Sequence, residues 1–210
     1  MRKFLFAALI LASTTVANAA LIGAPTVVQR TLVGAPANTV TNGIQISFDQ
    51  QLFGQQMVLE LTSGSVFQQA AFGTETAPTD ALIPVFADVA ADTFVTVGGY
   101  TSGTSSSALV VGGSTEIPGK GGPKKFDTAG INIAWAPAPG VVINSGNNFP
   151  IAQVTLSNNA NGTAWLFSNS GGTGQTFQLP VINGVIGIPE PTTCVLAGLA
   201  LVGAAARRRV

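Results

Sequence analysis

The side chains of this chain that could do chemistry are mostly carboxylates. Its 210 residues include no histidine, and the one cysteine, Cys194, lies in an apolar segment near the C-terminus. Ser-His-Asp and Cys-His nucleophile systems and His-ligated zinc are therefore excluded. A glycoside hydrolase would need two acidic residues that face each other across a cleft, and no recognisable acid/base motif is present. We therefore expect a protein that is not an enzyme, with a carboxylate-based glycoside hydrolase as the last alternative. The acidic residues before residue 188 are Asp49, Glu60, Glu75, Asp80, Asp88, Asp92, Glu116 and Asp127.

Two of these acids, Asp88 and Asp92, could supply hard oxygen ligands to calcium, which binds six to eight oxygens. The surrounding sequence has neither the spacing of an EF-hand loop nor a Gly-Gly-x-Gly-x-Asp repeat. The simpler interpretation is a turn with two exposed carboxylates. The sequence accordingly predicts no bound metal and no cofactor, and Asp88 and Asp92 are the weak candidates for a calcium site.

Aromatic residues could form a sugar-binding platform, because a flat ring can stack on the face of a pyranose. Trp135 alternates in phase with Ile131 and Ile133, which places it in the predicted core. Tyr100 lies in a stretch rich in Gly, Ser and Thr, where we expect its ring to be exposed. The alternation around Trp165 leaves its exposure open. Tyr100 and Trp165 are therefore the candidates for sugar stacking.

The elements that must position these residues are short strands. Apolar and polar residues alternate in short runs, and no convincing amphipathic run of ten or more residues predicts a helix. Clusters of Gly, Asn and Pro separate the runs. This pattern favours an all-β fold, an antiparallel β-sandwich with the jelly-roll as one variant. The predicted strands are 44–48, 57–62, 93–97, 108–111, 131–135, 151–156, 164–167, 176–181 and 185–188.

Two stretches do not fit a strand. Residues 98–107 and 112–125 are rich in Gly, Ser, Thr and Pro, and we expect long mobile loops there. The second stretch contains Lys120, Lys124 and Lys125, which we interpret as part of a solvated loop.

The central part of the chain, residues 20–187, has four basic and eight acidic residues and a net charge of −4. Nucleic acid is therefore not an expected partner, because binding it requires clustered cations. With Cys194 outside this part, we expect one domain without disulfides. Its Asn-rich turn at 158–162 is interpreted as a hairpin turn.

The N-terminus has the three parts of an export signal. Met1-Arg2-Lys3 is basic, residues 4–12 are apolar, and Ala17-Asn18-Ala19 has the small-x-small form that signal peptidase cleaves. A membrane anchor is the alternative, but an apolar run of this length forms only about 14 Å of helix against a hydrocarbon core of about 30 Å. The sequence predicts a signal peptide cleaved between Ala19 and Ala20.

The C-terminal segment combines a rigid motif, an apolar run and a basic cluster. Pro189-Glu190-Pro191 should stay extended, because proline fixes φ and removes an amide donor. Residues 192–206 can form a helix of about 22 Å, which is short for a bilayer and predicts transient membrane insertion. Arg207, Arg208 and Arg209 would keep the end of this helix cytoplasmic.

In the order and spacing of these parts, residues 188–210 resemble the PEP-CTERM sorting signal of exported bacterial proteins. The resemblance covers about a tenth of the chain. It implies recognition by exosortase, a membrane-embedded cysteine protease, and delivery to the cell surface or an exopolysaccharide matrix. It implies nothing about the activity of the preceding domain. An ordinary tail anchor is the alternative for this segment.

The sequence thus predicts a signal peptide over 1–19, a β-sandwich over 20–187 and a sorting signal over 188–210. The expected function is that of a structural or adhesive protein of the bacterial surface or extracellular matrix, with signal peptidase and exosortase as processing partners. The alternative is a carbohydrate-binding module for exopolysaccharide.

Overall fold

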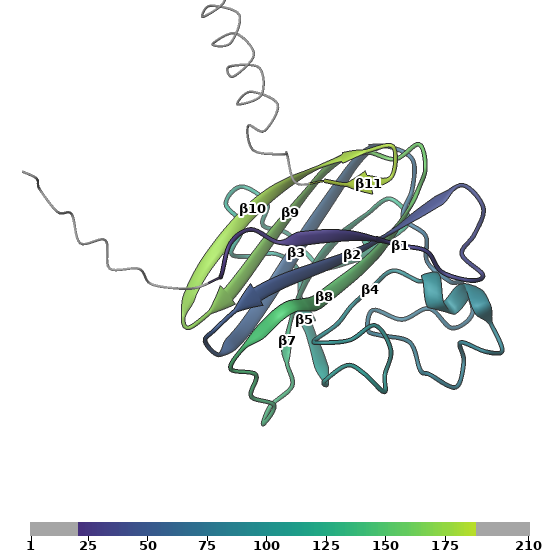
Figure 1. Ribbon diagram of the computed structural model, residues 1–210. Helices are drawn as coiled ribbons and strands as arrows, with labels where there is room; N and C mark the ends of the chain where they lie inside the picture. Colours follow the sequence, from purple (N-terminus) through teal and green to yellow (C-terminus); the bar gives the residue numbers. More distant parts are fainter. Residues whose placement is uncertain (1–20, 188–210) are drawn as a thin grey trace, which may run out of the picture.

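The computed structural model describes residues 21–187, which form two packed sheets (Figure 1). Every strand pairing within both sheets is antiparallel, which confirms the predicted antiparallel β-sandwich. The jelly-roll variant stays a prediction. The signal peptide, the Pro-Glu-Pro motif, the apolar tail helix and the arginine cluster lie outside the described residues.

The large sheet has the strand order β11-β10-β9-β3-β7-β5, and β6 pairs with one end of β7. Strands far apart in the sequence therefore lie side by side, with β3 between β9 and β7. The strands are β3 (Leu52–Ser63), β5 (Ala108–Gly112), β6 (Lys125–Asp127), β7 (Gly130–Pro137), β9 (Asn161–Ser170), β10 (Thr173–Ile182) and β11 (Val185–Ile186).

The small sheet has the order β1-β2-β8-β4 and crosses in front of the large sheet in Figure 1. Its two long strands, β2 and β8, form the centre, and the short strands β1 and β4 form the edges. The strands are β1 (Thr26–Arg30), β2 (Thr39–Phe48), β4 (Phe94–Val95) and β8 (Gly146–Ser157).

The core lies between the sheets and follows from alternation along the strands. On β7, Ile131, Ile133 and Trp135 point inward and are at most 1% exposed. The indole Nε1 of Trp135 donates to the backbone oxygen of Thr96 at 3.1 Å, so the buried ring also has its polar atom satisfied. The prediction that Trp135 belongs to the core is confirmed.

A buried asparagine joins the two sheets where the described chain ends. Asn42 of β2 is fully buried, and its Nδ2 donates to the backbone oxygen of Gly184 at 2.9 Å. Its Oδ1 accepts from the backbone N–H of Ile186 at 3.0 Å. The N–H of Gly187 then bonds to the oxygen of Pro180 at 2.9 Å. Side-chain and backbone hydrogen bonds thus fix β11 at both of its edges.

The structure corrects several sequence-based expectations. Strands β1 and β6 were not predicted, because both are short edge strands whose side chains are mostly exposed and therefore show little apolar alternation. A 3₁₀ helix, η1 (Ala87–Ala91), precedes Asp92. The turn at 158–162 is not a hairpin, because it connects β8 of the small sheet to β9 of the large sheet. Within residues 21–187, the structure has no helix whose length and hydropathy suit a membrane crossing.

Candidate functional site

Asp92 is buried rather than exposed, which corrects the expected turn with two exposed carboxylates. The residue is 2% exposed and follows η1 directly. Its Oδ1 accepts from the backbone N–H of Gln69 at 2.8 Å, and its Oδ2 accepts from that of Thr74 at 3.1 Å. The carboxylate therefore holds the loop 69–74 in place. A Cβ at Gly73 would lie 2.9 Å from Oδ2, so this close approach depends on glycine.

Burial raises the pKa of Asp92 to about 6, although the backbone hydrogen bonds act in the opposite direction. Asp88, on η1, adds a smaller upward contribution to this pKa. Asp88 itself is only partly buried and lies 3.5 Å from Nε2 of Gln69. Within residues 21–187, no three Asp, Glu, His or Cys side chains form a group that could hold a metal ion.

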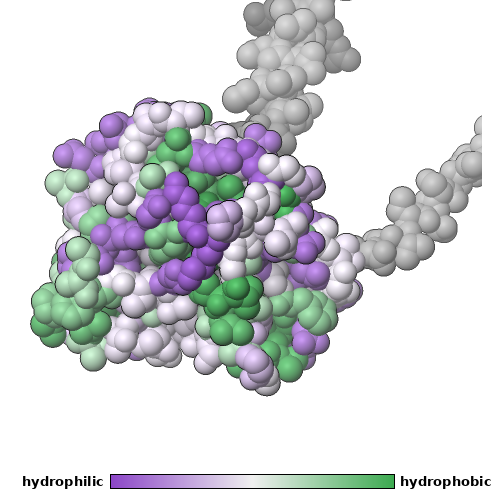
Figure 2. All heavy atoms as spheres, turned by 180° about the vertical axis from the view of Figure 1, so that it is seen from behind, coloured by the Kyte–Doolittle hydropathy of each residue, from purple (hydrophilic) through white to green (hydrophobic). Residues whose placement is uncertain are grey.

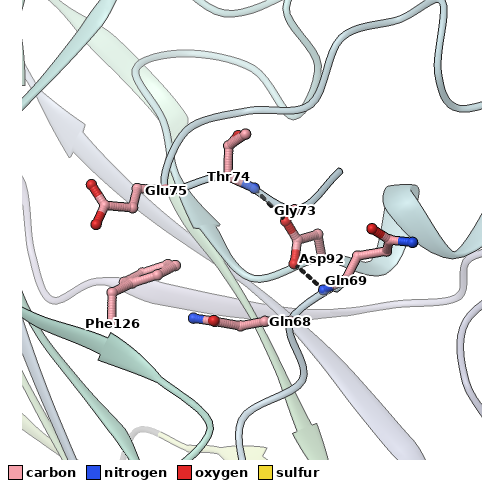
Figure 3. Close-up of a pocket in the computed structure, with 7 residues that line it drawn as sticks. All are labelled: Gln68, Gln69, Gly73, Thr74, Glu75, Asp92 and Phe126. Atoms are coloured by element: carbon pink, nitrogen blue, oxygen red, sulfur yellow. Dashed lines mark hydrogen bonds between the residues drawn. The ribbon is translucent and has the colours of Figure 1, made fainter. Parts of the chain in front are cut away.

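A cavity of 160 Å³ lies beside Asp92 (Figure 3). Its lining includes Gln68, Glu75 and Phe126 as well as the loop that Asp92 holds. Glu75 is paired with Lys124, whose Nζ lies 2.9 Å from Oε1. The Nε2 atom of Gln68 is buried and has no hydrogen-bond partner among the described residues. Figure 3 shows Gln68 extending toward Phe126, with Asp92 at the other side of the cavity.

Trp165 lies on the outer face of the large sheet, where a lysine covers its ring. The Nζ atom of Lys120 is 3.8 Å from the ring centroid. The same Nζ donates to both carboxylate oxygens of Glu60, at 2.9 and 2.7 Å. Trp165 is partly buried, and Gln178, its register partner on β10, is exposed. Trp165 is thus accessible in part, with one ring face taken by the ammonium group.

The loop 112–125 is attached to this outer face by side chains of the sheet. The Oε1 atom of Gln56 accepts from the Oγ of Ser114 at 3.1 Å and from the N–H groups of Thr115 and Glu116 at 2.9 and 3.0 Å. Asn132 accepts from the N–H of Ser114. The expected loop is present, but it is bonded along its length to β3 and β7.

Its lysines also have partners, which changes the interpretation of this loop as simply solvated. Lys120 pairs with Glu60 and Lys124 with Glu75. Lys125 lies 3.7 Å from Asp127. Each positive charge of the loop is therefore balanced by a nearby carboxylate.

Two open grooves flank this loop on the outer face. A groove of 490 Å³ is lined by Glu60, Lys120 and Asn132 among others. A second groove of 320 Å³ is lined partly by Gln56 and Phe167. The view from behind in Figure 2 shows hydrophilic residues across the middle of the surface and separate hydrophobic groups nearer its lower edge.

Tyr100, the other sugar-stacking candidate, lies far from Trp165 in the fold, against the small sheet. The Cζ atom of Arg30 is 3.7 Å from its ring centroid, and its hydroxyl accepts from Nε2 of Gln45 at 3.3 Å. Arg30 also donates to the buried Gln153. Burial lowers the pKa of Arg30, and interaction with Tyr100 partly offsets this. Tyr100 is partly buried, so its ring is less exposed than expected.

The polar residues that organise these sites were not predicted. Gln56, Gln68 and Gln153 occur in stretches that show no functional motif. Gln56 and Gln153 act through hydrogen bonds to residues about 60 positions away in the sequence. Strand alternation gave no signal at Gln153, because this residue is in phase with Thr155 and lies opposite Ala152, Val154 and Leu156, on the face that the pattern assigns to solvent.

Comparison with known proteins identifies one segment. Residues 187–209 match the family model of the PEP-CTERM protein-sorting motif. No curated protein and no solved structure matches the chain. The chain is thus an exported protein that exosortase sorts to the cell envelope. It carries the PEP-CTERM motif with Pro189, Glu190 and Pro191 inside the matched residues.

Proposed function

We propose that this protein is a non-catalytic adhesive component of the cell surface or of the extracellular polysaccharide matrix. The observation that carries the proposal is the outer face of the large sheet. There the ring of Trp165 contacts Lys120, whose ion pair with Glu60 lines an open groove, and the exposed amide of Gln178 lies on the neighbouring strand. Sorting to the envelope would place this face where extracellular polysaccharide is present.

The groups on this face suit a polysaccharide. The ring of Trp165 offers a stacking surface, and Lys120 with Glu60 offers donors and acceptors for sugar hydroxyls. Gln178 lies opposite Trp165 on the neighbouring strand and adds an amide. A sugar that stacks on the covered ring face would displace Lys120, whose ammonium could then bond to the hydroxyls.

The positions of the acidic residues support a function without catalysis. Glu60, Glu75 and Asp127 each lie beside a lysine, and the oxygens of Asp92 hold a loop. These carboxylates are thus engaged in separate structural contacts rather than facing one another as the acid pair of a glycosidase does.

The test is binding of the protein to exopolysaccharide isolated from its host. We expect saturable binding that Trp165→Ala abolishes, while Phe72→Ala, which removes an exposed ring elsewhere, leaves it unchanged. Tyr100→Ala tests the second stacking candidate. Binding that survives Trp165→Ala would remove the outer face from the proposal, and no binding at all would favour a purely structural role.

The sorting step has its own test. Replacing Pro189 and Pro191 by Ala should let the apolar helix extend upstream, hide the cleavage region and leave the precursor uncut. Deletion of the host exosortase should have the same result. The measurement is the intact mass of the surface protein, which should lack Cys194 and the residues 207–209. Finding these residues still attached would restore the tail-anchor interpretation.

A further inference from the structure

The cavity beside Asp92 is separate from the outer face of the large sheet and has a distinct chemistry. It is bounded by the loop that follows β3, by the residue after η1 and by Phe126 of β6. Its 160 Å³ equals about five water molecules at roughly 30 Å³ each, which is the scale of a single sugar ring rather than of a chain.

One hydrogen-bond donor of this cavity has no acceptor. Gln68 is one of the residues that line the cavity, and its Nε2 is shielded from solvent and has no acceptor among the described residues. A buried amide donor without a partner has lost its hydrogen bonds to water and gained none in return, which has a cost in stability. A ligand that supplies an acceptor oxygen would remove this cost.

The charged groups of the cavity narrow the class of ligand. Asp92 and Glu75 are both acidic, so an anionic ligand would be repelled. A metal ion requires acceptors, whereas the free atom at Gln68 is a donor and the two oxygens of Glu75 are bonded to Lys124 at 2.9 and 3.0 Å. A neutral ligand with acceptor and donor atoms remains.

A hydroxyl group suits this cavity, because it can accept a hydrogen bond from Gln68 and donate one to Asp92. Backbone hydrogen bonds fix both oxygens of Asp92, each of which keeps a lone pair for a ligand. The pKa of about 6 leaves this carboxyl mostly ionised at neutral pH, where it acts as an acceptor. Phe126 adds a flat apolar surface against which a ring can lie.

We infer that this cavity binds one neutral sugar residue, through Gln68 as donor, Asp92 as acceptor and Phe126 as the stacking ring. It is a second binding site, independent of the proposed outer-face site. A cavity of this size can take a chain end or a branch but not the middle of a polysaccharide.

The experiment uses the full chain in detergent micelles and saturation-transfer NMR with methyl glycosides of glucose, galactose and mannose. We expect saturation of at least one glycoside. Gln68→Leu and Gln68→Glu should each abolish it, because neither retains the donor, and Phe126→Leu should weaken it. Melting temperatures would verify that each variant is folded, and Gln68→Glu keeps the shape of the side chain if the leucine variant is not.

Trp165→Ala is the matched control, because it removes the outer-face ring and leaves the cavity intact. Saturation unchanged in this variant supports the second site, whether or not the outer face binds polysaccharide. Loss of saturation in Trp165→Ala, saturation in both Gln68 variants equal to that in the native protein, or no saturation with any glycoside would overturn the inference. Calcium binding that depends on Asp92 would also overturn it.

Discussion

Trp165 and Tyr100 each lie against a cation, but the two cations are held in different ways. Lys120 is bound to Glu60 in a pair that solvent reaches, with side chains 25% and 55% exposed. Arg30 bonds instead to the neutral, buried Gln153 and has no carboxylate partner among residues 21–187. Salt screens the first arrangement and has little effect on the second. Lys120 is therefore a removable cover on the ring of Trp165, because salt can weaken the ion pair that holds it. Arg30 is a fixed support for the ring of Tyr100, because its partner is a buried neutral side chain.

The largest expected effect comes from removing the anchor of Arg30. Gln153→Leu would leave the backbone oxygens of Ala90 and Asp92 without the amide that donates to them at 2.9 and 2.8 Å. It would also remove the acceptor of Arg30. We expect a loss of about 2–4 kcal/mol in the free energy of unfolding, measured by urea denaturation. Gln178→Leu on exposed β10 is the control, and a similar change in both variants would contradict a fixed support at Tyr100.

Removal of the cation itself should have a smaller effect. Arg30→Met keeps the apolar stem but loses the contact with Tyr100 and the bond to Gln153. We expect a loss of about 1–2 kcal/mol that is the same at low and high salt. A loss that disappears at high salt would show that Arg30 acts through a screened charge, as Lys120 does.

Asp92 should give a pH dependence of intermediate size, because its carboxyl group is buried and its pKa is raised. Its folded-state pKa of about 6 lies above the ordinary value of 3.8, so the folded protein binds the proton more tightly than the unfolded chain does. The stability of the native protein relative to Asp92→Asn should therefore fall as the pH rises from about 4 to about 6, and level off above. We expect about 1 kcal/mol after allowing for solvent screening. A difference that is flat over this range would place Asp92 in solvent.

The smallest effect on stability is expected at Lys120. Lys120→Met should cost about 0.5 kcal/mol at low salt and less at high salt, because the pair with Glu60 is exposed. Of the two tryptophans in the chain, Trp135 is buried, so acrylamide quenching of fluorescence reports on Trp165. High salt should increase quenching in the native protein but not in Lys120→Met. Equal quenching at both salt concentrations would contradict a removable cover.

The fold was largely predictable, because alternating burial is a local property of the sequence. Ile131, Ile133 and Trp135 lie on one face of β7 as the period of two requires. The edge strand β1 was missed, since none of its five side chains is buried and three are exposed, so its sequence does not alternate between apolar and polar residues. Which strands pair depends on contacts across the chain, and the sequence carries no local sign that β3 lies between β9 and β7.

The candidate sites were predictable only in part. Aromatic rings and carboxylates were recognised by type, which found Trp165 and Asp92. The residues that surround them were not recognised, because the contacting residues are far apart in the sequence. Lys120 and Glu60 are 60 positions apart, and Asp92 and Gln69 are 23 apart. Burial of a carboxylate is set by such distant partners, so the spacing of Asp88 and Asp92 suggested exposure where the fold buries one of them.

The contacts of Asn42 with the β11 turn have a mechanical consequence. While the chain is held at its C-terminal segment, any drag on the domain is transmitted through Gly187 to β11. This strand is two residues long, and its pairs with β10 would be loaded one after another, as in a zipper. Asn42 bonds the same turn to the small sheet, so the load is shared between both sheets before the long pairing of β10 with β9 is strained. β11 would therefore yield first under tension and spare the sandwich behind it.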